Sequence, residues 1–138
     1  MKILISACLL GVCCRYDGAS KPYPDVAALV ERHELVPVCP EQLGGLPTPR
    51  PPAERQGERV INNQGRDVTA QYQRGAREVL RLCRLYGCEC AVLKQRSPAC
   101  GSREVYDGSF SGTLVPGDGV AAELLMKNGI EVITEEEL

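Results

Sequence analysis

The chain has 138 residues, a net charge of −2 and a hydrophobic fraction of 43%, values that suit one domain with a substantial core. The near-neutral charge offers no basic face to a nucleic acid. One Phe, five Tyr and no Trp are also too few for a platform that stacks successive bases. We therefore expect no nucleic-acid partner. The unusual feature is the presence of eight cysteines, several of them clustered near the N-terminus.

The first predicted element is a strand over residues 2–7, a short apolar run typical of a strand buried on both faces of a parallel sheet. Its end, Ile5-Ser6-Ala7-Cys8, resembles the box in front of a lipidated cysteine. A signal peptide, however, needs an apolar region of roughly 7–15 residues before its cleavage site, and here only residues 3–5 separate Lys2 from Ser6. No stretch approaches the ~18 apolar residues of a membrane span. We expect a cytoplasmic protein with no membrane partner.

The following segments alternate between helix and strand signals. Apolar spacing predicts a helix over residues 24–33 and a strand over 35–38. Residues 41–58 are rich in Pro and Gly and are predicted to be irregular, and residues 58–62 form a strand. The strongest helix pattern covers residues 68–86, with Thr69 as its cap.

The C-terminal half continues the alternation. A strand is predicted over residues 89–93, followed by a long loop, a helix over 119–128 with Asp118 as its cap, and a strand over 130–133. This order predicts a single α/β domain over residues 1–138. We expect it to be Rossmann-like, with a mainly parallel sheet of about four strands and flanking helices.

Three cysteines follow predicted strands directly or in the next loop, namely Cys8, Cys39 and Cys100. The carboxyl ends of parallel strands share one edge of a sheet, where such folds bind ligands, so we expect these thiols to converge. Three thiolates can hold zinc or an iron–sulfur cluster, and three ligands on a four-iron cluster leave one iron open. The alternative is that some are inert buried cysteines.

The other cysteines divide into two groups. Cys14 lies in the same loop as Cys8 and is a candidate fourth ligand, whereas its neighbour Cys13 can point away. A second group lies at the opposite end of the third main strand, where core packing is the favoured interpretation. This group consists of Cys83, Cys88 and Cys90.

Two polar residues accompany the predicted ligands. Glu41 follows Cys39 by two positions, and Ser97 precedes Cys100 by three. A carboxylate near a partly buried site can move protons, and a hydroxyl can orient water, although a solvated acid and a turn cap are the simpler interpretations. Arg50 can either clamp a substrate or pair with an acid.

Several segments together identify the chain as similar to a known family. The segments SACLLGVCCRYDG, PVCPEQLGGLPTPRPPAE, GRDVT, LKQRSPACGS and YDGSFSGTLVPGDGVAAELL resemble domain of unknown function 523, whose characterised members are thiouracil desulfidases. The resemblance extends from about residue 3 to about residue 134. It implies a 4Fe–4S cluster held by only three cysteines, here Cys8, Cys39 and Cys100. It also implies an acid/base pair at Glu41 and Ser97.

The reaction implied by the resemblance is non-redox. Sulfur of a small thiolated nucleobase such as 2-thiouracil is replaced by oxygen from water, giving uracil and hydrogen sulfide, with an open iron as Lewis acid. Cys14 also belongs to the family-like first segment, so its role as a ligand stays open. The alternative function is a non-catalytic iron–sulfur or zinc thiol module for redox sensing or sulfur delivery. The oligomeric state cannot be predicted.

Overall fold

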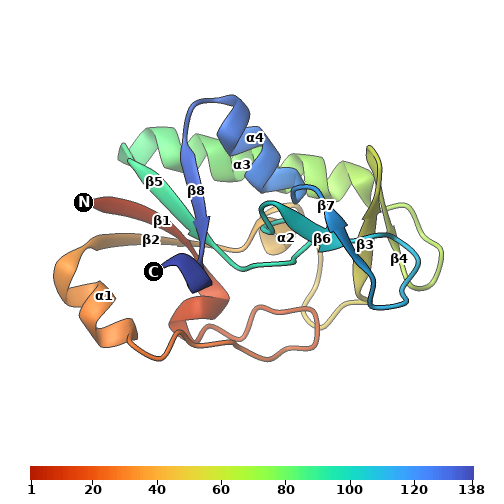
Figure 1. Cartoon of the computed structure of the whole chain (residues 1–138), viewed down its shortest axis with the longest axis horizontal. Helices are drawn as coiled ribbons and strands as arrows, with labels where there is room; N and C mark the ends of the chain where they lie inside the picture. The colour runs from red at the N-terminus through yellow and green to blue at the C-terminus, as the bar shows by residue number, and fades with distance from the viewer.

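The computed structural model describes residues 1–138, and its centre is a four-stranded sheet in the order β2-β1-β5-β8 (Figure 1). Every neighbouring pair in this sheet is parallel. The strands are β1 (Lys2–Ser6), β2 (Glu34–Val38), β5 (Cys90–Leu93) and β8 (Glu131–Thr134). The predicted fold class and the four main strands are therefore confirmed.

Helices cover both faces of the sheet. In Figure 1, α1 (Val26–Arg32) lies on one side, and α3 (Thr69–Tyr86) and α4 (Val120–Lys127) lie together on the other. Side chains of β1 alternate between two cores, with Leu4 packed under α3 and α4 and Ile5 facing the α1 side. Both side chains are fully buried, which explains why the strand shows no polar alternation.

The long helix α3 ends as predicted but begins differently. Gly87 has φ 66°, and the N–H of Cys88 donates to the carbonyl of Cys83 at 2.9 Å, which is a Schellman ending. The predicted cap at Thr69 is wrong. The Thr69 hydroxyl instead accepts the N–H of Val60 at 2.8 Å and so joins the helix to β4 (Arg59–Asn62).

Helix α4 also begins without the predicted side-chain cap. Gly119 is the cap residue, and the Asp118 carboxylate accepts the backbone N–H of Arg103 at 2.8 Å instead. Gly119 packs so closely on the loop after β5 that a Cβ would lie 2.5 Å from the carbonyl carbon of Ala99. Asp118 thus stabilises the loop that carries Cys100, and the start of α4 packs against the same loop.

The region predicted to be irregular, residues 41–58, contains regular structure. A short helix, α2 (Pro40–Leu43), follows β2, because proline is favoured in the first turn of a helix. After the prolines, β3 (Ala53–Gln56) pairs with β4 in an antiparallel hairpin. That prediction was wrong because the Pro and Gly content of a segment does not indicate where the chain begins to form paired strands again.

The loop after β5 contains a second hairpin, formed by β6 (Glu104–Tyr106) and β7 (Leu114–Pro116). Both hairpins lie beyond the carboxyl ends of the main strands (Figure 1). Short 3-10 turns, η1 (Ala7–Leu10) and η2 (Glu135–Glu137), follow β1 and β8. The carboxyl end of the sheet is therefore surrounded by added loops.

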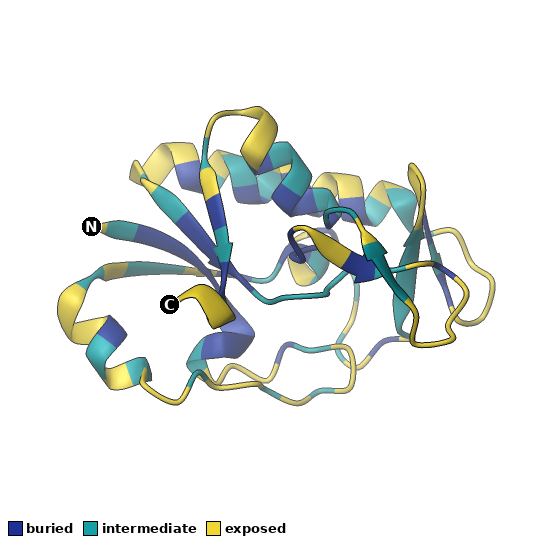
Figure 2. Cartoon of the chain, in the orientation of Figure 1, coloured by how far each residue is buried: buried dark blue, intermediate teal, exposed yellow.

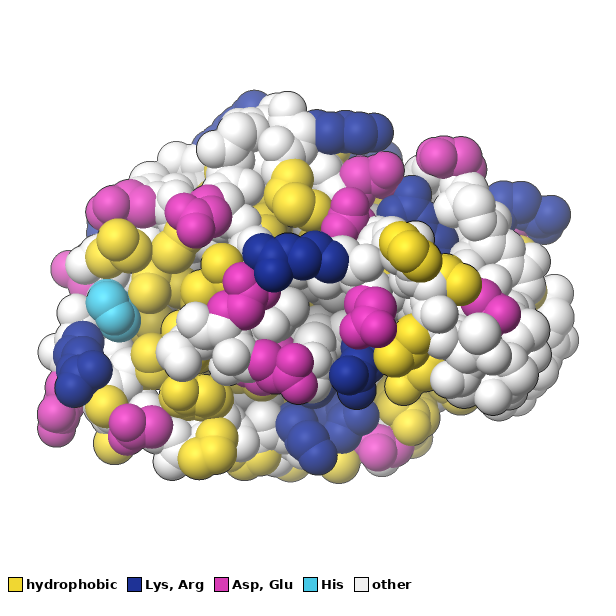
Figure 3. Space-filling model, viewed as in Figure 1, with side chains coloured by type: hydrophobic (Ala, Val, Ile, Leu, Met, Phe, Trp, Pro, Cys, Tyr) yellow, Lys and Arg dark blue, Asp and Glu magenta, His cyan; other side chains and the backbone are white.

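Burial follows this arrangement, with the sheet centre buried and the hairpin tips largely exposed (Figure 2). Basic and acidic side chains are interspersed on the face shown in Figure 3. None of the helices combines the length and the apolar character that crossing a membrane would require.

Candidate functional site

A cavity of about 630 Å³ opens at the carboxyl end of the sheet. The structure places all three predicted ligands on its wall, together with Cys14, Glu41 and Ser97. These residues come from three separate segments, those after β1, β2 and β5, so the sheet topology, rather than a local motif, brings them together. The convergence that the strand order predicted is present.

Each candidate ligand is placed by the end of a strand. Cys8 lies in the 3-10 turn directly after β1, and this turn closes at Gly11 with φ 93°. Cys39 is the residue before α2, immediately after β2. Cys100 lies in the turn that follows β5, close to the start of α4. Cys8 and Cys100 are buried, whereas Cys39 is partly exposed to the cavity.

The electrostatics of these thiols reflect burial and mutual proximity. Burial raises the pKa of Cys100 and of Cys8, and a thiolate at Cys39 raises both further. Burial, then the neighbouring Cys39 and Cys8, raises the pKa of Cys14 to about 12. Lys94 acts in the opposite direction on Cys8. Thiols with raised pKa values stay protonated unless a cationic centre compensates their charge, which is what metal ligation does.

The donor set fits an iron–sulfur cluster better than a single ion. All eight cysteines are free thiols, and no group of three or more His, Cys, Asp or Glu side chains is placed to hold one metal ion. Cysteines on a four-iron cluster bind different iron atoms, so their sulfurs are spaced more widely than on one zinc ion. Four cysteines line one open cavity, and three of them are buried, so the site offers several thiol ligands to such a cluster.

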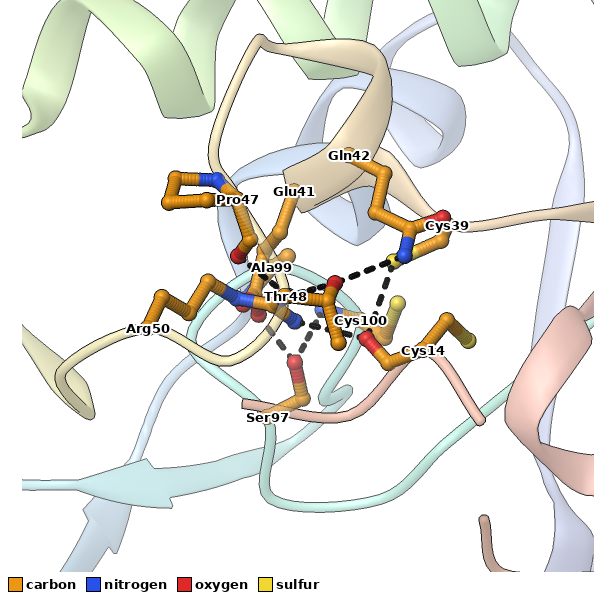
Figure 4. A network of polar contacts seen from close by, with 10 residues as sticks. All are labelled: Cys14, Cys39, Glu41, Gln42, Pro47, Thr48, Arg50, Ser97, Ala99 and Cys100. Carbon is orange, nitrogen blue, oxygen red and sulfur yellow. Dashed lines mark hydrogen bonds and ion pairs between the residues drawn. The ribbon is translucent and has the colours of Figure 1, made fainter. Parts of the chain in front are cut away.

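Cys13 and Cys14 have opposite environments although they are adjacent. Cys13 is exposed, as expected, whereas Cys14 is only 2% exposed and lines the cavity. The carbonyl oxygen of Cys14 accepts the Cys39 thiol at 3.7 Å (Figure 4). Cys14 is therefore inside the site, beside the three predicted ligands.

Glu41 lies on α2 and is held by Arg50. The Arg50 Nε donates to Glu41 Oε2 at 2.5 Å, and its Nη2 donates to the Cys14 carbonyl at 2.9 Å. Its remaining nitrogen, Nη1, reaches the Thr48 hydroxyl and the Pro47 carbonyl (Figure 4). Burial opposes the positive charge, but Glu41 outweighs it and raises the pKa of Arg50. Arg50 therefore pairs with an acid, which is one of the two roles that the sequence allowed for it.

Ser97 supports the turn that carries Cys100. Its Oγ accepts the backbone N–H groups of Ala99 at 3.1 Å and Cys100 at 3.0 Å (Figure 4). The oxygen therefore accepts two hydrogen bonds, and the hydroxyl hydrogen remains available to a group in the cavity. The turn-cap interpretation of Ser97 describes the structure, and it is compatible with a role in the site.

Several further residues reach the site that the sequence did not single out, among them Ser6, Tyr72 and Lys94. The Ser6 hydroxyl accepts the backbone N–H of Lys94 at 2.8 Å and lies beside Cys100, where it lowers the pKa of that thiol against the effect of burial. Tyr72 of α3 is 3% exposed and lies beside Glu41, where burial and that carboxylate raise its pKa. Lys94 pairs with Glu135 at 2.9 Å. Only Ser6, a polar residue at the end of an apolar strand, carried a detectable signal.

The remaining cysteines lie away from the cavity, as predicted. The Cys83 thiol contacts the Cys88 carbonyl at 3.9 Å, and the Cys90 thiol contacts Met1 Sδ at 3.8 Å. None of the three lines the cavity.

The fold and the cavity define an α/β protein with a polythiol site at the carboxyl end of a parallel sheet. The chain belongs to the 2-thiouracil desulfurase family, whose model matches residues 3–137.

One relative is the uncharacterized protein YbbK of Bacillus subtilis (strain 168), which is 42% identical over 146 residues, covering 99% of this chain and 97% of the relative. A solved structure, the 4Fe-4S-dependent thiouracil desulfidase TudS, is 48% identical. It superposes with a TM-score of 0.89 over 99% of this chain and 92% of that one.

Proposed function

We propose that this chain is an iron–sulfur-dependent, non-redox desulfidase that converts a thiolated pyrimidine such as 2-thiouracil to uracil with release of hydrogen sulfide. The observation that carries the proposal is the gathering of four thiols, Glu41 and Ser97 around one cavity. The similarity to TudS supports it. The reaction balances without an oxidant or reductant: the C=S group and one water give C=O and hydrogen sulfide.

In this proposal Cys8, Cys39 and Cys100 hold a 4Fe–4S cluster. When bound, the cluster supplies an open iron that acts as a Lewis acid toward the sulfur of the substrate. The buried thiols around the cavity are compatible with this role because their protons are released only to a cationic centre. Free thiols persist in the reducing cytoplasm, which we propose as the location of the protein.

Glu41 acts as the general base in this mechanism. Arg50 orients its carboxylate from a buried position. In this proposal the oriented carboxylate accepts a proton from the attacking water. Ser97 acts as a hydrogen-bond donor to the edge of the pyrimidine ring, since two backbone N–H groups already occupy its oxygen. The ring is thereby oriented toward both the water and the thiol wall.

The first test is the iron and acid-labile sulfide content after anaerobic reconstitution of the wild type and of single Ser variants. We expect loss of the cluster in Cys8→Ser, Cys39→Ser and Cys100→Ser, and full loading in the control Cys13→Ser, because Cys13 is exposed. Dependence on Cys14 as well would indicate a closed cluster and favour redox sensing or sulfur delivery. No cluster in any variant would contradict the proposal.

The second test is turnover of 2-thiouracil, followed as uracil and sulfide, in variants that retain iron. We expect Ser97→Ala to lose turnover by about 10²-fold, the usual contribution of a positioned donor. Because Ser97 also stabilises the Cys100 turn, its iron content is measured in the same sample. Full turnover in an iron-loaded Ser97→Ala variant would contradict the donor role.

A further inference from the structure

The tip of the β6–β7 hairpin carries Phe110 to the wall of the cavity. Phe110 is the only Phe of the chain and is 39% exposed. Its φ is 58°, a left-handed conformation that is uncommon for a bulky residue and costs free energy. Such conformations persist where surrounding contacts impose them, and they concentrate at ligand clamps.

Contacts from β3 impose this conformation. Glu54 Oε1 accepts the backbone N–H groups of Gly108 at 3.0 Å and of Phe110 at 3.1 Å. Gln56 Nε2 donates to the Gly108 carbonyl at 2.9 Å, and a Cβ at Gly108 would lie 2.4 Å from the Gln56 Cγ. The carboxylate of Glu54 therefore holds the tip on both sides of Ser109. The connection between the two short strands of a hairpin does not by itself require hydrogen bonds from a neighbouring strand.

The base of this support is itself fixed. Arg55, the neighbour of Glu54 on β3, donates to the Asp118 carbonyl at 2.7 Å and pairs with Glu123 of α4 at 2.8 Å. The strand that holds the hairpin tip is thus tied to a helix of the main domain. Phe110 is held at the cavity wall before any ligand arrives, which lowers the entropic cost of binding.

We propose that Phe110 packs against the flat face of the pyrimidine ring and that Glu54 is the positioning residue that holds it there. The inference rests on the proposed function and specifies how the substrate is selected. A pyrimidine presents polar atoms at its edge and an apolar π-surface on its face. Ser97 and Glu41 provide polar groups for the edge, and Phe110 provides an aromatic surface for the face.

The test compares 2-thiouracil turnover and calorimetric binding of uracil in iron-loaded wild type and Phe110→Ala. We expect the KM for 2-thiouracil and the dissociation constant of uracil to rise together by about tenfold, the usual order for loss of one base–aromatic stack. The kcat stays within about twofold, because the contact is made equally in the bound substrate and in the transition state. Phe110→Tyr keeps the ring and stays near wild type. Leu85→Ala, an exposed apolar residue distant from the cavity, is the matched control.

Glu54 is tested through its dependence on Phe110. Glu54→Ala is expected to raise KM as Phe110→Ala does, and the double variant is expected to raise it no further, because Glu54 acts through the aromatic ring. Glu54→Gln keeps an acceptor oxygen and is expected to restore part of the affinity. Additive effects in the double variant would mean that Glu54 contacts the substrate directly, which would overturn its assignment as a positioning residue.

The result that overturns the Phe110 assignment is a KM and a uracil dissociation constant within twofold of wild type in an active Phe110→Ala enzyme. Should Phe110→Ala fail to load iron, Phe110→Leu provides the same test, since it keeps an apolar side chain but removes the π-face. A wild type that loads iron but neither binds uracil nor releases sulfide would contradict the proposed function itself. The two failures are therefore distinguishable.

Discussion

The two ends of the central sheet carry thiols that differ in surroundings rather than in burial. Cys14, at the carboxyl end, is 2% exposed, and Cys83, at the amino end, is 1% exposed. Cys14 lines a cavity together with other thiols, a carboxylate and an arginine, whereas Cys83 packs inside the Schellman ending of α3 against Cys88. Burial alone therefore does not separate a candidate ligand from a core thiol. What separates the two is the cavity beside Cys14 and the number of thiols that line it.

The largest difference is expected when one thiol is removed from each end. Cys39→Ala is expected to lose the cluster and more than about 10²-fold of desulfidase turnover, because a cluster ligand cannot be replaced by a methyl group. Cys83→Ala is expected to keep both, since its thiol faces the core and not the cavity. Iron content and sulfide release measure both variants. Loss of iron in Cys83→Ala would show that the thiols at the amino end also take part in metal binding. That result would contradict the distinction between the two ends of the sheet.

The carboxylate at the carboxyl end is expected to matter for turnover but not for the cluster. Glu41→Gln keeps an acceptor for Arg50 but cannot accept a proton, so we expect turnover to fall by about 10²-fold at unchanged iron content. The control is Glu123→Gln, whose carboxylate also pairs with an arginine but lies outside the cavity. Turnover is measured as uracil formed per iron. An unchanged rate in Glu41→Gln would favour a sensing module over an enzyme.

The ion pair at the carboxyl end is expected to contribute to stability as well. Arg50→Ala leaves the Glu41 side chain, which is only 12% exposed, without its partner, a loss that typically costs about 3 kcal/mol of unfolding free energy. Arg59→Ala breaks a pair with Asp67 that is largely exposed, so a loss below about 1 kcal/mol is expected. Urea unfolding at one pH compares the two. Equal losses would show that Glu41 can be solvated in the folded chain.

The smallest expected effect is a pH dependence at the amino end. Burial, then the neighbouring Cys88, raises the pKa of Cys83 from 9.0 to about 11. Below pH 9 this thiol is protonated in both the folded and the unfolded chain, and its full contribution to the unfolding free energy is present. As the pH rises toward 11, the unfolded chain ionises first, and the unfolding free energy falls. Urea unfolding from pH 8 to pH 11 is expected to show a shallower fall in Cys83→Ala, and an identical slope would contradict the assignment.

Much of the fold and the meeting of the thiols could be predicted from the sequence because both depend on short-range patterns. Apolar runs and helical spacings gave the parallel sheet, and cysteines placed just after strands meet because carboxyl ends of parallel strands share one edge. Cys8, Cys39 and Cys100 thus reach one cavity from distant positions. The isolation of Cys83 from that cavity followed from the same reasoning.

The partners of the site residues were decided only by the tertiary structure. Glu41 pairs with Arg50 across a proline-rich segment, Tyr72 reaches the site from a helix, and Glu54 holds Phe110 from another hairpin. No local pattern marks these contacts, because they depend on how loops pack once the sheet has formed. The sequence therefore shows which residue types are available to the chemistry. Their orientation, and the contacts that hold them in place, follow from long-range packing.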